Sequence, residues 1–101
     1  MSEDKYTAVV AKDLEDLIPG FFKNRHKELE ALRAALATGD WEQMRHLGHR
    51  MKGVGTSYGF EPISAIGKTI EDGAKQQDAT AMDGQLAEYA DYLEKVKVVY
   101  E

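Results

Sequence analysis

Apolar residues recur at spacings of three and four along most of the chain, which is the pattern of amphipathic α-helices. The first such run predicts a short leading helix and consists of Val10, Leu14, Leu17 and Ile18. Pro19 follows directly and suits the first turn of a new helix, because its ring fixes a helical φ and the missing N–H needs no partner there. The leading helix is therefore expected to end before a longer one begins.

Four longer runs follow, at residues 22–36, 41–58, 63–74 and 82–100. The last is the cleanest and repeats through Met82, Leu86, Tyr89, Leu93, Val96 and Tyr100. Gly39 suits a helix end, and Asp40 suits the N-cap of the next helix, with Gln43 three residues on as in a capping box. Gly59 suits the end of that helix, and Pro62 suits the first turn of the helix that follows. All the predicted connections are short.

Short connections force consecutive helices to run antiparallel, because the chain cannot return to its starting end. The sequence therefore predicts an all-α fold, an antiparallel up-down-up-down four-helix bundle with a short additional N-terminal helix. We find no period-two alternation of β-branched residues and expect no strands. The methionines and aromatic residues in the apolar runs are assigned to the core. A chain of 101 residues predicts a single domain over 1–101, too small for a separate catalytic domain.

Charge and composition limit the classes of molecule that the chain is expected to bind. The 13 basic and 18 acidic residues give a net charge of −5, which argues against nucleic acid and anionic membranes as partners. The chain has no cysteine, which excludes disulfides and thiol chemistry. The first ten residues, MSEDKYTAVV, lack a signal-peptide pattern, and no apolar run approaches the roughly 20 residues of a membrane span. A cytoplasmic protein is expected.

The segment LGHRMKGVGTSYGF, residues 47–60, is unusual because it holds four glycines in and at the end of a predicted helix. Each interior glycine costs roughly 1 kcal/mol relative to alanine. With about 100° per residue, His49 projects nearly opposite the apolar stripe of this helix. The residues sharing its exposed face are Arg45, Lys52, Gly53 and Thr56. The histidine is therefore predicted to face solvent.

An exposed imidazole can act as a nucleophile without help, since one ring nitrogen keeps a lone pair when the ring is neutral. Gly53 leaves the space one turn beyond His49 uncovered, and Arg45 and Lys52 bring positive charge beside it. This arrangement suits an incoming phosphoryl group. Glu71, at the flank of the next helix, is a candidate acceptor for the second ring nitrogen. The alternative is that Glu71 is one more solvated carboxylate.

These residues also resemble a known family. The sequence HRMKG followed by a further glycine is similar to the histidine-containing phosphotransfer (HPt) domain, with a histidine, a lysine three on, a glycine four on and another glycine about ten on. The matching positions are His49, Lys52, Gly53 and Gly59. The segment ALATGDWEQMRHLGHRMKG also resembles the family's approach to its active helix, and the similarity covers nearly the whole chain. The family fold is likewise an antiparallel four-helix bundle.

The resemblance implies a role for each matching residue. His49 would accept the phosphoryl group, Lys52 would assist with its charge, Gly53 would give a partner access, and Gly59 would be structural. Chemotaxis-kinase relatives place a glutamate near the position of Glu71, bonded to the histidine, whereas many relay members place a glutamine there. Neither Gly48 nor Gly55 matches the pattern; Gly55 is attributed only to close helix packing and Gly48 has no assigned role.

The resemblance also implies the partners. Receiver domains of response regulators or hybrid histidine kinases would exchange the phosphoryl group with the histidine, and the Mg²⁺ would be supplied by the receiver, so that this chain binds no cofactor of its own. The chain has no glycine-rich phosphate loop and is not expected to be a kinase. We expect a monomer. Receiver docking calls for an apolar patch, for which Leu17, Ile18 and Phe21 are the candidates.

Two other functions compete with this hypothesis. His46 and His49, with His26 on the preceding helix, could be imagined as metal ligands, although no HExxH pattern or carboxylate cluster completes such a site. The chain could also be an adaptor that binds a signalling partner along a helix groove without using phosphate.

Overall fold

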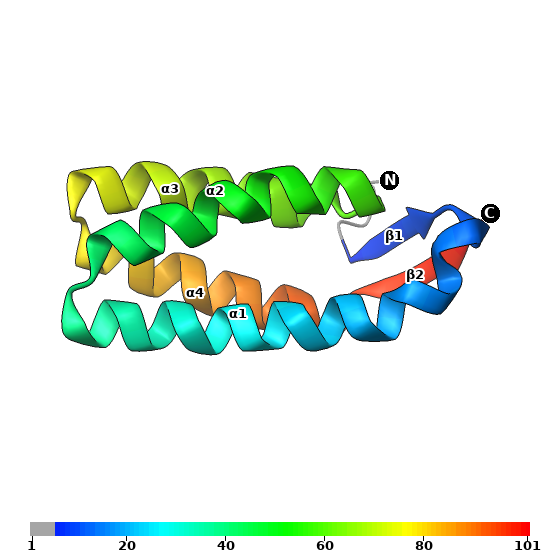
Figure 1. Ribbon diagram of the computed structural model, residues 1–101, viewed down its shortest axis with the longest axis horizontal. Helices are drawn as coiled ribbons and strands as arrows, with labels where there is room; N and C mark the ends of the chain where they lie inside the picture. Colours follow the sequence, from blue (N-terminus) through cyan, green and yellow to red (C-terminus); the bar gives the residue numbers. More distant parts are fainter. Residues whose placement is uncertain (1–5) are drawn as a thin grey trace.

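Four long helices run back and forth along the molecule, so each is antiparallel to the next (Figure 1). The computed structural model describes residues 6–101. The helices are α1 (Ile18–Thr38), α2 (Trp41–Tyr58), α3 (Glu61–Gln76) and α4 (Ala79–Lys95). The predicted up-down-up-down bundle is confirmed.

The helix ends follow the signals in the sequence. Gly39 lies in the left-handed region with φ 71°, where a side chain would be strained, and it ends α1. The side chain of Asp40 then accepts a hydrogen bond from the backbone N–H of Gln43 and caps α2. Gly59, with φ 92°, ends α2 in the same way as Gly39 ends α1. These stops set the length of α2 and therefore the height of His49 along the bundle.

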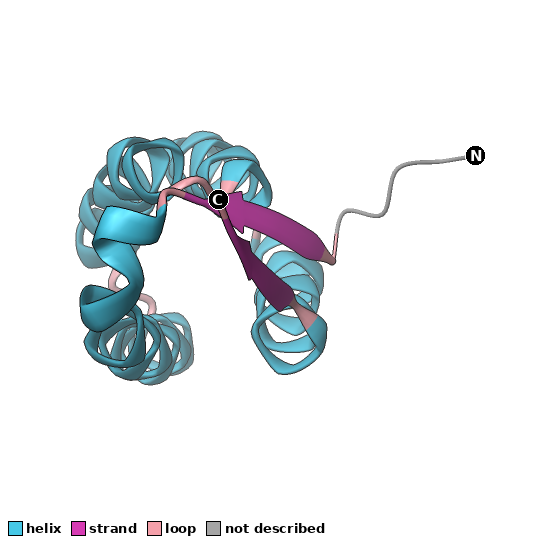
Figure 2. Ribbon diagram, turned by 90° about the vertical axis from the view of Figure 1, so that its right-hand side faces the viewer, coloured by secondary structure: helices cyan, strands magenta, loops and turns pink. Residues whose placement is uncertain are grey.

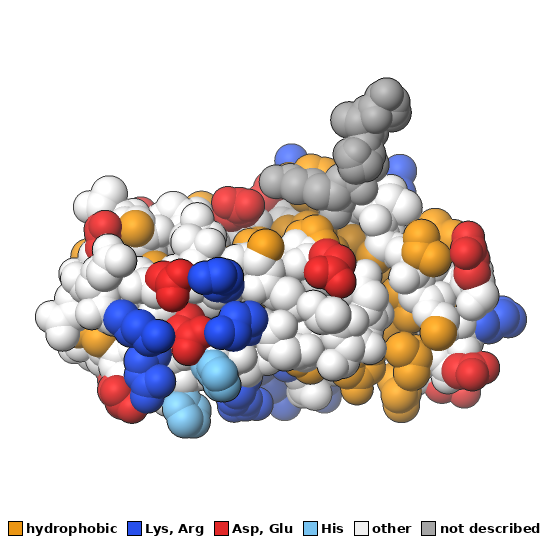
Figure 3. All heavy atoms as spheres, turned by 90° about the horizontal axis from the view of Figure 1, so that it is seen from above, with side chains coloured by type: hydrophobic (Ala, Val, Ile, Leu, Met, Phe, Trp, Pro, Cys, Tyr) orange, Lys and Arg blue, Asp and Glu red, His pale blue; other side chains and the backbone are white. Residues whose placement is uncertain are grey.

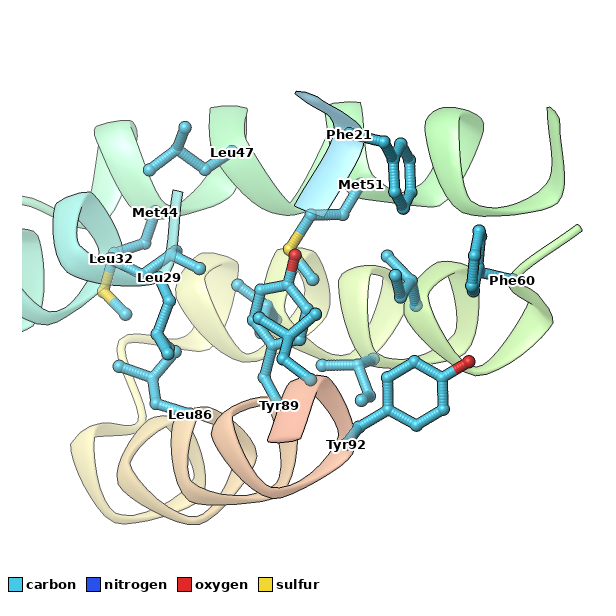
Figure 4. Packing of buried hydrophobic residues seen from close by; sticks show 14 of the residues in the cluster. Phe21, Leu29, Leu32, Met44, Leu47, Met51, Phe60, Leu86, Tyr89 and Tyr92 are labelled. Carbon is cyan, nitrogen blue, oxygen red and sulfur yellow. The ribbon is translucent and has the colours of Figure 1, made fainter. Parts of the chain in front are cut away.

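The core is built from the predicted apolar stripes of all four helices (Figure 4). Its most deeply buried side chains include Leu32, Met44, Met51, Ile63, Ile70, Met82 and Tyr89. Burial of this apolar surface is the main force that holds four helices together, because isolated helices of this length are marginal in water. No helix in the described part of the chain is long and apolar enough to cross a membrane.

Two short strands close one end of the bundle, which the sequence analysis did not predict (Figure 2). Strand β1 (Thr7–Val10) pairs in parallel with β2 (Lys97–Tyr100), with Val9 opposite Val99. The prediction of a leading helix from Val10 was therefore wrong at its start. A six-residue 3-10 helix (Lys12–Leu17) follows β1 instead. Residues 1–5, part of the segment judged to lack a signal peptide, lie outside the described residues.

The last helix is also shorter than predicted, because it ends at Lys95 and the chain continues as β2. Val96 and Tyr100 are four apart, which fits a helical stripe, but Val96, Val98 and Tyr100 also fit the period of two of a strand. The partner strand lies about 90 residues away in sequence, and local pattern cannot reveal such pairing. The ladder ties both ends of the chain to the same end of the bundle.

A polar cluster is buried between α1 and α4. The Nε atom of Arg25 lies 3.1 Å from Oε1 of Glu28, and the hydroxyl of Tyr89 donates to the same oxygen at 2.8 Å. Burial raises the pKa of Glu28 above its usual value, and Arg25 and Tyr89 oppose that shift. The buried hydroxyl of Tyr92, in contrast, has no hydrogen-bond partner among the described residues.

This contrast between two tyrosines on one helix gives the first prediction. Tyr89→Phe removes a donor from a buried carboxylate and is expected to lower the free energy of unfolding by about 1–3 kcal/mol. Tyr92→Phe removes a hydroxyl that has no partner and is expected to change it by less than about 0.5 kcal/mol or to stabilise the protein. Urea unfolding of both variants measures the difference, and equal losses would contradict the assignment.

Candidate functional site

His49 lies in the middle of α2 with 65% of its side chain exposed, as predicted. Its Nδ1 atom is 3.1 Å from Oε2 of Glu71 on α3. An ionised carboxylate can only accept a hydrogen bond, so Nδ1 carries the proton and donates it. Nε2 is then the nitrogen with the lone pair, which makes it the nucleophilic atom of the ring.

Glu71 is the centre of the site and is almost buried, with 8% of its side chain exposed. Nζ of Lys52 lies 2.9 Å from Oε1, and Nζ of Lys75 lies 4.0 Å from Oε2. The hydrogen bond from Lys52 is the main cause that lowers the pKa of Glu71, with a further contribution from His49. Figure 3 shows lysine and arginine side chains gathered around carboxylates, beside the histidines. The alternative of a solvated Glu71 is wrong.

The remaining predicted residues have different surroundings. Gly53 is open, since a Cβ added there would have nothing within 4 Å. Arg45 pairs with Glu42 on its own helix at 2.6 Å instead of with Glu71. Oγ1 of Thr56 lies 2.8 Å from Oγ of Ser64, so Thr56 is tied to the seam between α2 and α3. The structure therefore brings Lys52 and Glu71 to the ring, whereas Arg45 and Thr56 are engaged elsewhere.

Three glycines let the backbones of α2 and α3 touch. A Cβ on Gly48 would lie 2.7 Å from the backbone nitrogen of Glu71 and 2.8 Å from the carbonyl oxygen of Gly67. A Cβ on Gly55 would lie 2.6 Å from the backbone nitrogen of Ser64. On the α3 side, a Cβ on Gly67 would lie 2.8 Å from the backbone nitrogen of Lys52. Real Cβ atoms do not approach other atoms this closely, so all three positions require glycine.

This contact explains the two glycines left without a firm role by the sequence. Gly48 precedes His49 directly and touches the backbone of Glu71, so the same contact sets the separation of the two side chains. Gly67 was missed by the sequence analysis, and so were Ser64 and Lys75. Small residues at 64 and 67, one turn apart on α3, are the signal that could have identified this contact face.

The apolar docking patch predicted on the first helices is largely wrong. Leu17 is 52% exposed, but Ile18 and Phe21 are 4% and 5% exposed and belong to the core. Phe21 stacks against Phe60 with 4.9 Å between ring centroids, which explains its burial. Of the three residues, only Leu17 is available at the surface.

The metal-site alternative gains no support from the geometry. Within residues 6–101, no group of three or more histidine, aspartate or glutamate side chains lies close enough together to hold a metal ion. His26 lies on α1 and lines a groove toward α4, away from the face that carries His49.

A family model described as "Hpt domain" matches residues 10–97, which is most of the chain. The chain belongs to the Hpt domain family. Members of this family carry phosphoryl groups on histidine in phosphorelays and generally interact with receiver domains. Searches of curated proteins and of solved structures gave no match.

The close contact between Gly48 and α3 in this Hpt domain can be tested by substitution. Gly48→Ala places a methyl group against the backbone of α3 and is expected to cost about 1–3 kcal/mol of stability. It should also separate His49 from Glu71. The matched control is Gly53→Ala in the same helix, which meets open space and is expected to stabilise by up to about 1 kcal/mol. Thermal unfolding and the imidazole NMR shifts measure the two effects.

A pH titration tests whether Glu71 is held ionised in the folded protein. Because its pKa is lowered in the folded protein, its contacts should stabilise the fold at pH above the ordinary glutamate value of about 4.3, and this contribution should be lost as the pH falls through the lower folded pKa. Lys52→Met should move the pKa of Glu71 back up, since it removes the main cause. Carboxyl ¹³C NMR measures this pKa, and an unchanged value in the variant would contradict the assignment.

Proposed function

We propose that this Hpt domain is a histidine phosphotransfer protein whose phospho-accepting residue is His49. It would accept a phosphoryl group from the phosphoaspartate of a receiver domain, or from a histidine kinase, and pass it to a response regulator. The observation that carries the proposal is the exposed imidazole whose Nδ1 is held by a nearly buried carboxylate, with Nε2 left for reaction. The opening over Gly53 gives a partner room to approach.

The transfer step is a displacement at phosphorus. The Nε2 lone pair attacks, the N–P bond forms, and the bond from phosphorus to the aspartate oxygen breaks, so that the partner's carboxylate leaves with the electron pair. The ring keeps its proton on Nδ1 and becomes positively charged. Glu71 would stabilise this charge through the existing hydrogen bond, and the reverse step would return the phosphoryl group to a second aspartate.

Lys52 is proposed to assist with the negative charge of the phosphoryl group. Its ammonium has three N–H donors, and the contact with Glu71 uses one of them. The side chain is 43% exposed, so the remaining donors stay available on the side from which a partner would arrive. Glu71 thereby positions both the nucleophile and the cation, and we assign it the role of a positioning residue. Arg45 and Thr56 are proposed only as contacts at the rim of the partner interface.

A phosphoaspartate donor is a receiver domain, and the receiver would supply the Mg²⁺ that neutralises charge in the transition state. We propose that the chain works as a cytoplasmic monomer and has no kinase activity of its own. The net charge of −5 supports partners other than nucleic acid.

The test is intact-protein mass spectrometry after incubation with a phosphorylated receiver domain and Mg²⁺. We expect one added phosphate, labile in acid and stable in base, in the wild type and none in His49→Gln. His46→Gln is the matched control, since it changes an exposed histidine one turn away in the same helix and should leave labelling intact. Because His49 is exposed, its substitution should change stability by less than about 1 kcal/mol.

The outcomes separate the two candidate functions. Labelling that persists in His49→Gln would overturn the assignment of the acceptor. A wild type that takes no phosphate from any receiver, yet still binds a signalling partner equally well as His49→Gln, would favour the adaptor.

A further inference from the structure

Two cations on neighbouring helices form no close ion pair with a carboxylate and lie near each other, unlike Lys23 and Lys97, which also form none among the described residues. Most lysine and arginine side chains of residues 6–101 lie within 4.0 Å of a carboxylate. Lys27 on α1 and Arg50 on α2 are exposed, and neither forms such an ion pair within that part of the chain. In a protein with a net charge of −5, a groove lined by Arg25, Lys27 and Arg50 against the single carboxylate of Glu28 is a local reversal of sign.

These two cations line the same groove. It lies between α1 and α2 and has a volume of about 460 Å³. Asn24 and Lys27 contribute to the α1 wall, and Gln43 and Arg50 to the α2 wall. Apart from the buried Arg25 on the α1 wall, each wall thus carries one cation and one amide, and all four side chains have hydrogen-bond donors.

The groove also contains a carboxylate, but its charge is already compensated. Glu28 is 4% exposed and lies 3.1 Å from Nε of Arg25, while the hydroxyl of Tyr89 donates to it. The Arg25 guanidinium in turn lies over the ring of Phe21, 4.9 Å from its centroid. Arg25 is thus the close partner of Glu28, and Arg50 acts on this carboxylate only from a longer distance. Lys27 and Arg50 therefore keep N–H donors for an outside ligand.

We propose that the groove between α1 and α2 is an anchoring site for an acidic side chain of the receiver domain that docks on His49. The inference rests on the proposed function and deepens it by naming a contact that selects the partner. Arg50 follows His49 directly in α2, so a protein that covers the imidazole also covers the edge of the groove. The carboxylate of the partner would accept hydrogen bonds from Lys27 and Arg50.

A protein partner explains the arrangement better than a small anion. The two cations and two amides are spread over both walls of an open groove and do not surround a closed pocket. Charges at the edge of an interface mainly speed association and exclude partners of the wrong sign. An overall acidic chain repels an acidic receiver, so the two cations would determine the orientation in which it approaches.

The experiment compares charge reversals in the complete chain. Lys27→Glu, Arg50→Glu and the double variant are tested for phosphotransfer from a phosphorylated receiver that labels the wild type. Arg33→Glu is the matched control, because it makes the same charge change on α1 but lines the grooves toward α4. Labelling by phosphoramidate, a small donor that needs no docking, reports separately on the chemistry of His49.

The double variant is expected to lose about tenfold or more in transfer rate from the receiver, with a weaker dependence on salt, while phosphoramidate labelling and the Arg33→Glu control stay near wild type. Equal transfer rates and equal salt dependence in the double variant and the wild type would overturn the inference but leave the proposed function intact. If neither the receiver nor phosphoramidate labels the wild type, both the proposed function and this inference are overturned. Receiver affinity measured in the His49→Gln background checks the docking contact without any chemistry.

Discussion

The contact between the backbones of α2 and α3 is the constraint on which the site depends. Gly48 and Gly67 leave no side chain between the two helices at the level of the histidine, and Gly55 does the same one to two turns further on. Any Cβ there would push the helices apart. The separation of His49 and Glu71 follows from this contact, since both side chains leave helices whose spacing is fixed by the backbone.

The glycines make α2 less stable as an isolated helix, because each of them lowers the helix propensity of the segment. The cost is offset by tertiary packing, in which the backbone atoms of α2 and α3 make close contacts that larger residues would prevent. Gly53 differs from the others, since no atom approaches it and its space lies on the exposed face beside His49. Glycines in α2 therefore stand in two kinds of place, in the close contact with α3 and on the open surface beside His49.

Glu71 is a nearly buried carboxylate that stays ionised. A carboxylate with 8% of its side chain exposed is held ionised by the lysine that contacts it, and it can then fix the ring tautomer of His49. The second buried carboxylate, Glu28, has the opposite shift because desolvation outweighs Arg25 and Tyr89. The two faces of α2 thus differ: on the α3 side Glu71 holds the ring of His49, and the α1 side carries the groove with Lys27 and Arg50.

The sequence by itself determined the bundle, the end of α1, both ends of α2 and the exposure of His49, because these follow from local periodicity, from caps such as Asp40 and from left-handed glycines such as Gly59. It did not determine the strand pair, since β1 and β2 are paired across almost the entire chain, and Val96 and Tyr100 at this end of the chain also fit a helical stripe. It left Glu71 with two possible environments. Only the tertiary structure decided between them, because the depth of a side chain depends on how closely two helices approach, and that distance is set by pairs of residues far apart in sequence.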